Sequence, residues 1–297
     1  MKGFSRTRVR ALAVGAVAFV FLAPFTSCAS DKRPIAAITT APGTAALGDG
    51  GAPVFSTGKN DVVLKIESGI GGFRTFQSTF AALPTLLITG DGRVFSEGPV
   101  PTIFPGPFLP NIQVATVTRS EMAELLNAAK SVGLLGKIPD YTVGVPQVTD
   151  VGSTALTLTV NGQNFTHEAF ALGMEQVDAP DRKVLKDFIE LVTARTSGLQ
   201  SAPFLANTYL LATLPVEIST DPTVAPGSGD PVPQIEPWSS EIGINLKDLT
   251  CAPVSAEKVQ ALFEGSNQLT YFSQDGGLYT LAVRPVLPGQ PGCESTR

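Results

Sequence analysis

Residues 84–98 read PTLLITGDGRVFSEG. The pair Asp91-Gly92 stands between two apolar runs, which is a strong signal for a β-hairpin. Asn161-Gly162 and Asp275-Gly276 stand in the same relation to the runs beside them. Three hairpins along one chain predict antiparallel sheets, and further strands are expected over residues 61–70, 209–219 and 242–249.

Helical spacing follows the first two hairpin segments. Thr118 and Glu121 fit a capping box, and one helical face then carries Met122, Leu125, Leu126, Ala129 and Val132. A second helix is expected from about Pro180 to Arg195, with the face Val184, Leu185, Phe188, Leu191 and Val192. A third is expected between Ser255 and Gly265. The sequence thus predicts an α+β fold, antiparallel sheets with helices packed on one face. Residues 99–110, with five prolines, are expected to be an irregular or edge segment, and residues 221–237 an irregular loop.

The first 27 residues have the layout of a secretory signal. Residues 1–10 carry four basic residues and no acidic one, and residues 11–25 are uncharged. This order is typical of signal peptides, and the apolar run is shorter than the roughly 20 residues of a membrane-spanning helix. Phe25-Thr26-Ser27-Cys28 resembles the lipobox of bacterial lipoproteins, with Phe25 in place of the usual leucine. It predicts cleavage after residue 27 and lipidation of Cys28; the alternative is ordinary cleavage that leaves Cys28 unmodified.

The cysteine count supports a modified Cys28. The chain has three cysteines, and an odd number in an exported protein leaves one thiol to be explained. With Cys28 bound to lipid, Cys251 and Cys293 can pair in an oxidising compartment; the alternative is two separate buried thiols. A disulfide here closes a loop of about 42 residues and contributes about 4 kcal/mol in the chain-entropy model.

Without the signal the chain is acidic. Four of its 21 basic residues and none of its 26 acidic residues lie in residues 1–27, which leaves 17 against 26 and a formal charge of −9. An acidic chain without a basic cluster disfavours nucleic acid and anionic lipid headgroups. We therefore expect no nucleic-acid partner, and contact with the membrane through the covalent lipid anchor on the extracytoplasmic face.

Composition divides the chain into four parts. Residues 1–27 are the predicted signal, and residues 28–60, rich in small residues and proline, are expected to form a flexible tether. Residues 61–200 are expected to form an α+β domain, and residues 201–297 a smaller α+β module closed by the disulfide. One domain and two modules are both compatible with the sequence.

Reactive side chains do not form a recognisable active-site motif. His167 is the only histidine and is interpreted as structural. Ser255 and Lys258 match S-x-x-K, but its partner motifs are missing, so Ser255 is interpreted as a helix cap. A loop with Asp221, Asp230 and Glu236 could attract a cation; its spacing fits no EF-hand, and a solvated loop is the favoured interpretation. No metal and no cofactor are predicted.

Two further residues invite a functional reading. Asn164-Phe165-Thr166 is a formal glycosylation sequon, which we interpret as coincidental beside a bacterial export signal. Trp238, the only tryptophan, stands among prolines. It either marks a contact surface or anchors a loop on the core.

Several short blocks spread over about residues 60–293 share a pattern. They are Leu83-Pro84-Thr85, Gly90-Asp91-Gly92-Arg93-Val94, Gly133-Leu134-Leu135 with Tyr141 and Asp150, Ala171-Leu172-Gly173, Trp238, Cys251, and Arg284-Pro285-Val286-Leu287-Pro288 before Gly292-Cys293. Together they resemble a group of actinobacterial lipoproteins or secreted proteins of unknown function, with Val286 where that group has leucine. The resemblance implies an extracytoplasmic domain with Cys251 paired to Cys293. It carries no catalytic residues.

Three functions are compatible with these observations. The favoured one is a non-catalytic, surface-tethered module that binds another macromolecule or an envelope component. The first alternative is a carrier of a lipid or other apolar ligand between sheet and helices. The second is a cell-envelope hydrolase that uses carboxylates such as Asp91, Asp140 or Asp150.

Overall fold

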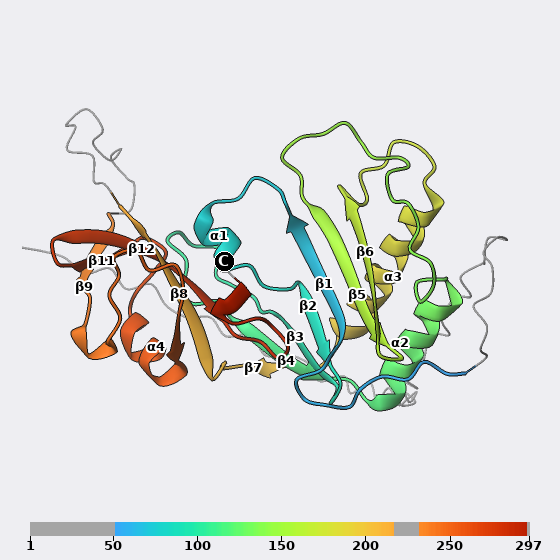
Figure 1. The fold of residues 1–297 in the computed structure, drawn as a ribbon, viewed down its shortest axis with the longest axis horizontal. Helices are drawn as coiled ribbons and strands as arrows, with labels where there is room; N and C mark the ends of the chain where they lie inside the picture. The colour runs from blue at the N-terminus through green and yellow to red at the C-terminus, as the bar shows by residue number, and fades with distance from the viewer. Residues whose placement is uncertain (1–50, 217–231, 296–297) are drawn as a thin grey trace, which may run out of the picture. The chain divides into compact units, whose positions relative to one another are not determined.

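A computed structural model describes residues 51–216 and 232–295. In these ranges the chain forms a seven-stranded and a five-stranded sheet with helices packed against them (Figure 1). The predicted α+β fold class is confirmed. Residues 1–50, which include the predicted signal and Cys28, lie outside the described residues, as do Asp221 and Asp230.

The first sheet has the strand order β6–β5–β1–β2–β3–β4–β7, and every neighbouring pair is antiparallel. Two of the three predicted hairpins, β2–β3 and β5–β6, form here. The strands are β1 (Val62–Ile70), β2 (Leu86–Thr89), β3 (Arg93–Glu97), β4 (Ile112–Thr116), β5 (Ser153–Val160), β6 (Gln163–Phe170) and β7 (Ala202–Pro203).

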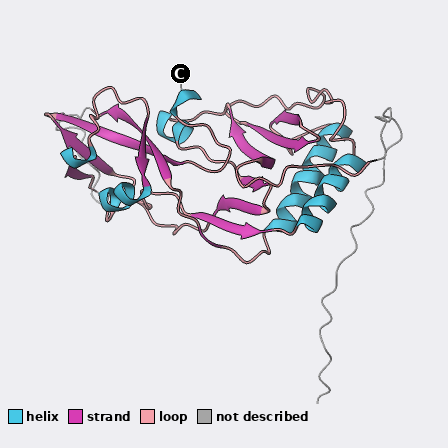
Figure 2. Cartoon of the chain, turned by 60° about the horizontal axis from the view of Figure 1, so that its bottom comes forward, coloured by secondary structure: helices cyan, strands magenta, loops and turns pink. Residues whose placement is uncertain are grey.

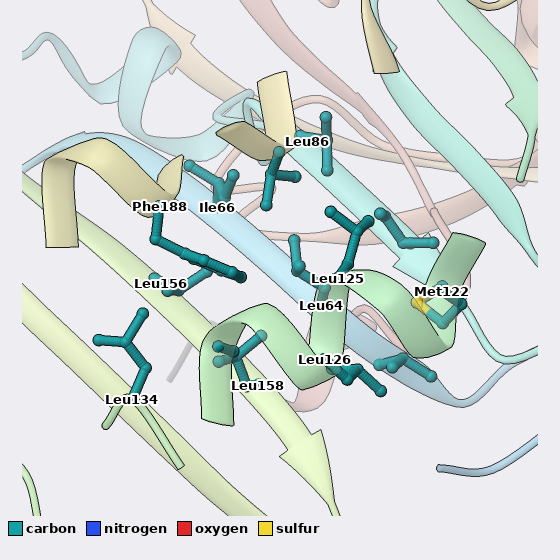
Figure 3. Packing of buried hydrophobic residues seen from close by; sticks show 14 of the residues in the cluster. Leu64, Ile66, Leu86, Met122, Leu125, Leu126, Leu134, Leu156, Leu158 and Phe188 are labelled. Atoms are coloured by element: carbon teal, nitrogen blue, oxygen red, sulfur yellow. The ribbon is translucent and has the colours of Figure 1, made fainter. Parts of the chain in front are cut away.

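One face of this sheet is covered by α2 (Arg119–Ser131) and α3 (Pro180–Thr196), which run side by side in Figure 2. Thr118 caps α2 through the predicted capping box with Glu121. Side chains alternate along a strand, so every second residue points at the helices. Figure 3 shows the result, in which Leu64 of β1 packs with Leu126 of α2 and Phe188 of α3.

The opposite face of the sheet is partly covered by later parts of the chain. Leu87 of β2 and Phe95 of β3 alternate with the helix-facing residues and point the other way. They form a separate buried cluster with Ile112 and with Leu287, which follows the last strand. Phe204 packs edge-on against Phe95, with ring centroids 4.9 Å apart. All four residues of β2 are buried as a result.

The second sheet has the strand order β10–β8–β12–β11–β9 and includes the third predicted hairpin, β11–β12. Its pairs are antiparallel except β11–β9, which is parallel. The strands are β8 (Thr208–Pro215), β9 (Gln234–Pro237), β10 (Ala252–Ser255), β11 (Thr270–Gln274) and β12 (Gly277–Pro285).

Helices lie on both faces of the second sheet. On one face, Val259 and Phe263 of α4 (Ala256–Phe263) pack in the cluster that contains Leu211 and Leu281. On the other face, α1 (Phe76–Phe80) inserts Phe80 against Leu210, Ala212 and Ala282. The first sheet thus has the predicted one-sided helix packing and the second does not. Because α1 belongs to the β1–β2 connection, Phe80 packs this part of the first sheet's chain against the second sheet.

Cys251 and Cys293 form a disulfide with a Cα–Cα distance of 5.5 Å. Both pack against the cluster around Phe80. The disulfide therefore ties the C-terminal turn η2 (Cys293–Ser295) to the start of β10, and the pairing is the one that the cysteine count favours.

Some predicted elements differ. The strand expected over residues 242–249 is wrong: a short 3₁₀ turn, η1 (Ser240–Ile242), precedes irregular chain in which Leu246 N–H binds the Gln274 side chain and Asp248 has a φ of 59°. That side-chain bond takes the place of a ladder bond. The segment predicted to be irregular up to residue 237 contains β9. Residues 202–203, beyond the predicted boundary at residue 200, pair with β4 of the first sheet.

Candidate functional site

The first sheet has two different ends. At one end lie the tight turns at Asp91-Gly92 and Asn161-Gly162. The other end, where Ile70 pairs with Ser153 and Ser153 with Phe170, carries the longer connections. In Figure 1 it is the end of the sheet to which the arrowheads of β1 and β6 point. We call it the loop end: Ile70 with the connection to Phe76, and the segments 98–111, 140–152 and 171–179.

Exposed apolar side chains gather at the loop end. Of the fifteen large hydrophobic residues that are exposed within the described ranges, ten lie there. Phe73 is 87% exposed and Ile103 is 68% exposed, so neither contributes to a core. Exposed apolar groups that gather on one part of a protein mark an interaction site. The ten are Ile70, Phe73, Phe76, Val100, Ile103, Phe104, Val143, Val145, Met174 and Val177.

Close backbone contacts hold the loops of this end together. A Cβ atom on Gly152 would overlap the backbone of Gly69, so the end of β1 and the start of β5 meet without room for a side chain. A Cβ atom on Gly144, whose φ is 76°, would lie 2.9 Å from the Cβ atom of Ala179. The end of β1 with the loop that follows it therefore packs against segment 140–152, and that segment packs against segment 171–179.

Arg182 secures the base of two of these loops. Its guanidinium donates to three backbone carbonyls, those of Tyr141 at 2.9 Å, Phe170 at 2.6 Å and Ala171 at 3.1 Å. Its Nε donates to Glu175 at 2.7 Å, and the arginine side chain is 1% exposed. Burial raises the pKa of Glu175, but hydrogen bonds from backbone N–H groups and from Arg182 outweigh it, so that the pKa is lowered.

A polar cavity of about 330 Å³ adjoins the loop end. Arg74, between the exposed Phe73 and Phe76, donates to the Ser68 carbonyl at 2.9 Å, and Glu97 stands at the end of β3. The wall therefore offers both a guanidinium and a carboxylate, which suit a polar ligand. The residues that line the cavity are Ser68, Arg74, Ala81, Ala82, Leu83, Thr85 and Glu97.

His167 is placed in the core, as its structural interpretation predicts. The residue is fully buried, with Nδ1 2.7 Å from the Tyr141 hydroxyl and Nε2 2.8 Å from the Leu134 carbonyl oxygen. Burial lowers the pKa of His167 although the bond to Leu134 opposes this shift. Both nitrogens are thus used in holding β6 to the chain that follows α2.

The other candidates have structural partners. Trp238 is 7% exposed and donates from Nε1 to the Ile244 carbonyl at 2.8 Å, so it anchors a loop on the core. Glu236 accepts a hydrogen bond from Ser266 at 3.2 Å. Asn164 of the sequon lies in β6 and accepts from Thr159. Ser255 occupies the N-cap of α4, but its side chain makes no capping hydrogen bond, so the predicted side-chain cap is wrong.

The three carboxylates proposed for hydrolysis are spread over the first sheet. Asp91 lies in the β2–β3 turn, where burial raises its pKa but bonds with Thr89 and the nearby Arg93 lower it overall. Asp150 precedes β5 at the loop end and has a φ of 63°. Asp140 accepts from the Thr142 N–H, which lowers its pKa. Asp91 and Asp150 therefore lie at opposite ends.

The described residues contain no group of three or more histidine, cysteine or carboxylate side chains placed to hold a metal ion. In the same ranges, no helix has the length and apolar character needed to cross a bilayer.

The loop end was not predicted from the sequence. Its signal is present, however: Phe73, Ile103 and Phe104 stand in segments rich in glycine or proline, which form loops. Large apolar residues in such segments have no regular element through which to reach a core. The surface could have been found by asking where apolar side chains and turn composition coincide.

Comparison with known proteins gives no relative, since no protein-family model, curated protein or solved structure matches this chain.

Proposed function

We propose that this protein is a lipoprotein held by a lipid on Cys28 at the extracytoplasmic face of the cell membrane. Its folded part is a non-catalytic module that binds an apolar surface of another envelope component through the loop end. The observation that carries the binding role is that ten exposed apolar side chains lie at the loop end.

The entry of the chain supports this assignment. Gly51 accepts a hydrogen bond from Lys130 at 2.6 Å, and Val54 exchanges hydrogen bonds with Asn161 in the β5–β6 turn. Residues 51–54, the last part of the predicted tether to be described, thus contact the sheet at the end opposite the loop end. Residues 51–54 therefore leave the loop end uncovered, as binding of a partner there requires.

The anchor is tested by the intact mass of the protein extracted from native membranes, measured with and without reductant. The expected mass begins at Cys28, includes a diacylglyceryl group, and increases by two hydrogens on reduction. An unlipidated mass would show a released protein and remove the tethered role.

Binding at the loop end is tested with a photo-reactive amino acid placed at Ile103 or at Val54. Both positions are 68% exposed, and Val54 lies at the opposite end of the sheet. In the native envelope, Ile103 should give a discrete cross-linked species and Val54 should not. Phe73→Ser should weaken that cross-link, because it removes an exposed ring from the same surface. Equal labelling at both positions would contradict a specific surface.

The two alternative functions have their own tests. If the protein is a carrier, solvent extraction should still release bound lipid after the covalent anchor has been removed. The polar lining of the cavity around Arg74 and Glu97 does not favour this role. A hydrolase that works through a carboxylate pair, as most glycosidases do, needs both carboxylates at one bond. Asp140→Asn and Asp150→Asn should abolish any hydrolytic activity found in the purified protein if that role is correct.

A further inference from the structure

The strand β6 forms an open edge of the first sheet. It meets β5 in a two-residue turn in which Asn161 and Gly162 have φ values of 54° and 73°. In such a turn the flanking residues, here Val160 and Gln163, form a hydrogen-bonded pair. Because the pattern alternates, Asn164, Thr166 and Glu168 direct their N–H and C=O groups away from β5.

These outward backbone groups are unpaired within residues 51–216 and 232–295. The described hydrogen bonds of Asn164 and Thr166 are made by their side chains, to Thr159 at 3.0 Å and Thr157 at 3.3 Å. All three side chains are exposed and project from the face opposite the buried His167. The edge therefore offers a row of donors and acceptors on an exposed part of the chain.

The other three sheet edges are protected and β6 is not. β7 has two residues and ends in Pro203, while β9 and β10 have four residues each and contain Pro237 and Pro253. Proline and short length are two devices that prevent edge-to-edge pairing. β6 has eight residues, QNFTHEAF, with no proline, no lysine or arginine and no shift of register.

We propose that β6 is the interface with a second copy of this chain. The two β6 strands pair antiparallel about a two-fold axis at Thr166, which extends one sheet into the other. Thr166 then faces the partner's Thr166, and Asn164 faces the partner's Glu168. Each such pair exchanges two backbone hydrogen bonds, and the Asn164 amide can donate to the partner's carboxylate.

Charge selects this register over its neighbours. An axis at Glu168 would set two carboxylates directly opposite each other, which is destabilising. An axis at Asn164 would place the turn residue Gly162 opposite Thr166 and shorten the ladder. The centred register alone pairs the three outward residues with one another, and it opposes no like charges. This self-complementarity favours a second copy over an unrelated peptide.

Cysteine cross-linking of the full chain, detergent-extracted where it is membrane-bound, tests the register. Residues in a hydrogen-bonded antiparallel pair have Cα atoms about 5.5 Å apart, within the range that a disulfide spans. Thr166→Cys should give a covalent dimer on mild oxidation. Asn164→Cys and Glu168→Cys should each remain single but should link when mixed. Failure of Thr166→Cys to link, or self-linking of the other two, would overturn the proposal.

Light scattering of the same protein tests the interface without cross-links. The expected mass of the polypeptide is twice that of one chain. Thr166→Glu should reduce it to one chain, because two carboxylates meet at the axis. Thr157→Glu is the matched control, one strand further in and opposite Lys65, and should keep the dimer. Circular dichroism identifies any variant that fails to fold. A wild-type monomer, or an edge occupied by the chain's own N-terminal segment, would contradict pairing between copies.

Discussion

The hydroxyl of Tyr141 and Nδ1 of His167 lie 2.7 Å apart in the core of the first sheet. The Leu134 carbonyl on the other side of the ring can only accept, so Nε2 carries the proton and Nδ1 accepts from Tyr141. The neutral imidazole satisfies both partners. A protonated ring would turn Nδ1 into a donor, so the Tyr141 hydroxyl would lose the acceptor of its own hydrogen bond, and a charge would be buried in the core.

The stability of the fold should therefore depend on pH through His167. Burial lowers the folded-state pKa below the usual value near 6.5, so the unfolded chain binds the proton more tightly. The contribution of neutral His167 to the free energy of unfolding is complete above pH 6.5. It is lost as the pH falls below that value, by at most about 1.4 kcal/mol per pH unit. Urea unfolding between pH 5 and 8 measures this. His167 is the only histidine, and His167→Gln should flatten the profile. An unchanged slope would contradict the assignment.

Removing the Tyr141 hydroxyl tests the same network from the other side. Tyr141→Phe leaves Nδ1 of His167 buried without a donor, which should lower the free energy of unfolding by about 1–3 kcal/mol. Tyr271→Phe is the control, because the structure shows no hydrogen bond of its half-buried side chain within the described residues. Chemical denaturation at pH 7.5 compares the two. Equal losses would mean that the Tyr141 hydroxyl has no special role.

Arg182 should be among the most sensitive positions. Arg182→Met removes four hydrogen bonds and leaves the Glu175 carboxylate without its cation, which should cost about 3–5 kcal/mol. Lys183→Met changes the neighbouring exposed residue, whose ion pair with Asp187 lies on the helix surface, and should cost about 0.5 kcal/mol or less. Thermal unfolding distinguishes them. A mild effect of Arg182→Met would refute its role in holding the loops.

The disulfide should stabilise the whole described fold. Its cysteines are 42 residues apart, and a loop of this length predicts a loss of about 4 kcal/mol on reduction. Cys251→Ala with Cys293→Ala should lower the melting temperature to that of the reduced wild type. Reductant should have no further effect on the variant. A reduced wild type as stable as the oxidised protein would contradict this prediction.

Local sequence signals predicted much of the fold. Turn pairs such as Asn161-Gly162 and the capping box at Thr118 act over a few residues, so their structural meaning can be read directly. β9 was missed because its four residues pair in parallel with β11, a contact between segments distant in sequence. α1 was missed because it has only five residues and Phe80 is its one buried side chain. That side chain packs mostly against residues of the second sheet, which are distant in the sequence.

The candidate site was less predictable for the same reason. The buried arginine at position 182 shows only as a charge on a helix, while its carbonyl partners come from two separate loops. The loop end exists because the strand order brings residues 70–76 and 140–152 to the same end of the sheet. The sequence alone identifies the apolar residues of these loops, but only the pairing of the strands shows that the loops lie at the same end of the sheet.

Leu287 completes a buried cluster whose other members are synthesised much earlier. Leu87 and Phe95 are made early, yet the cluster that shields them is completed by a residue close to the end of the chain. Phe80 depends in the same way on β12 and Cys293. A chain that has been synthesised only to residue 286 therefore exposes apolar side chains that Leu287 would cover. Chains cut short before residue 287 should be prone to aggregation and degradation.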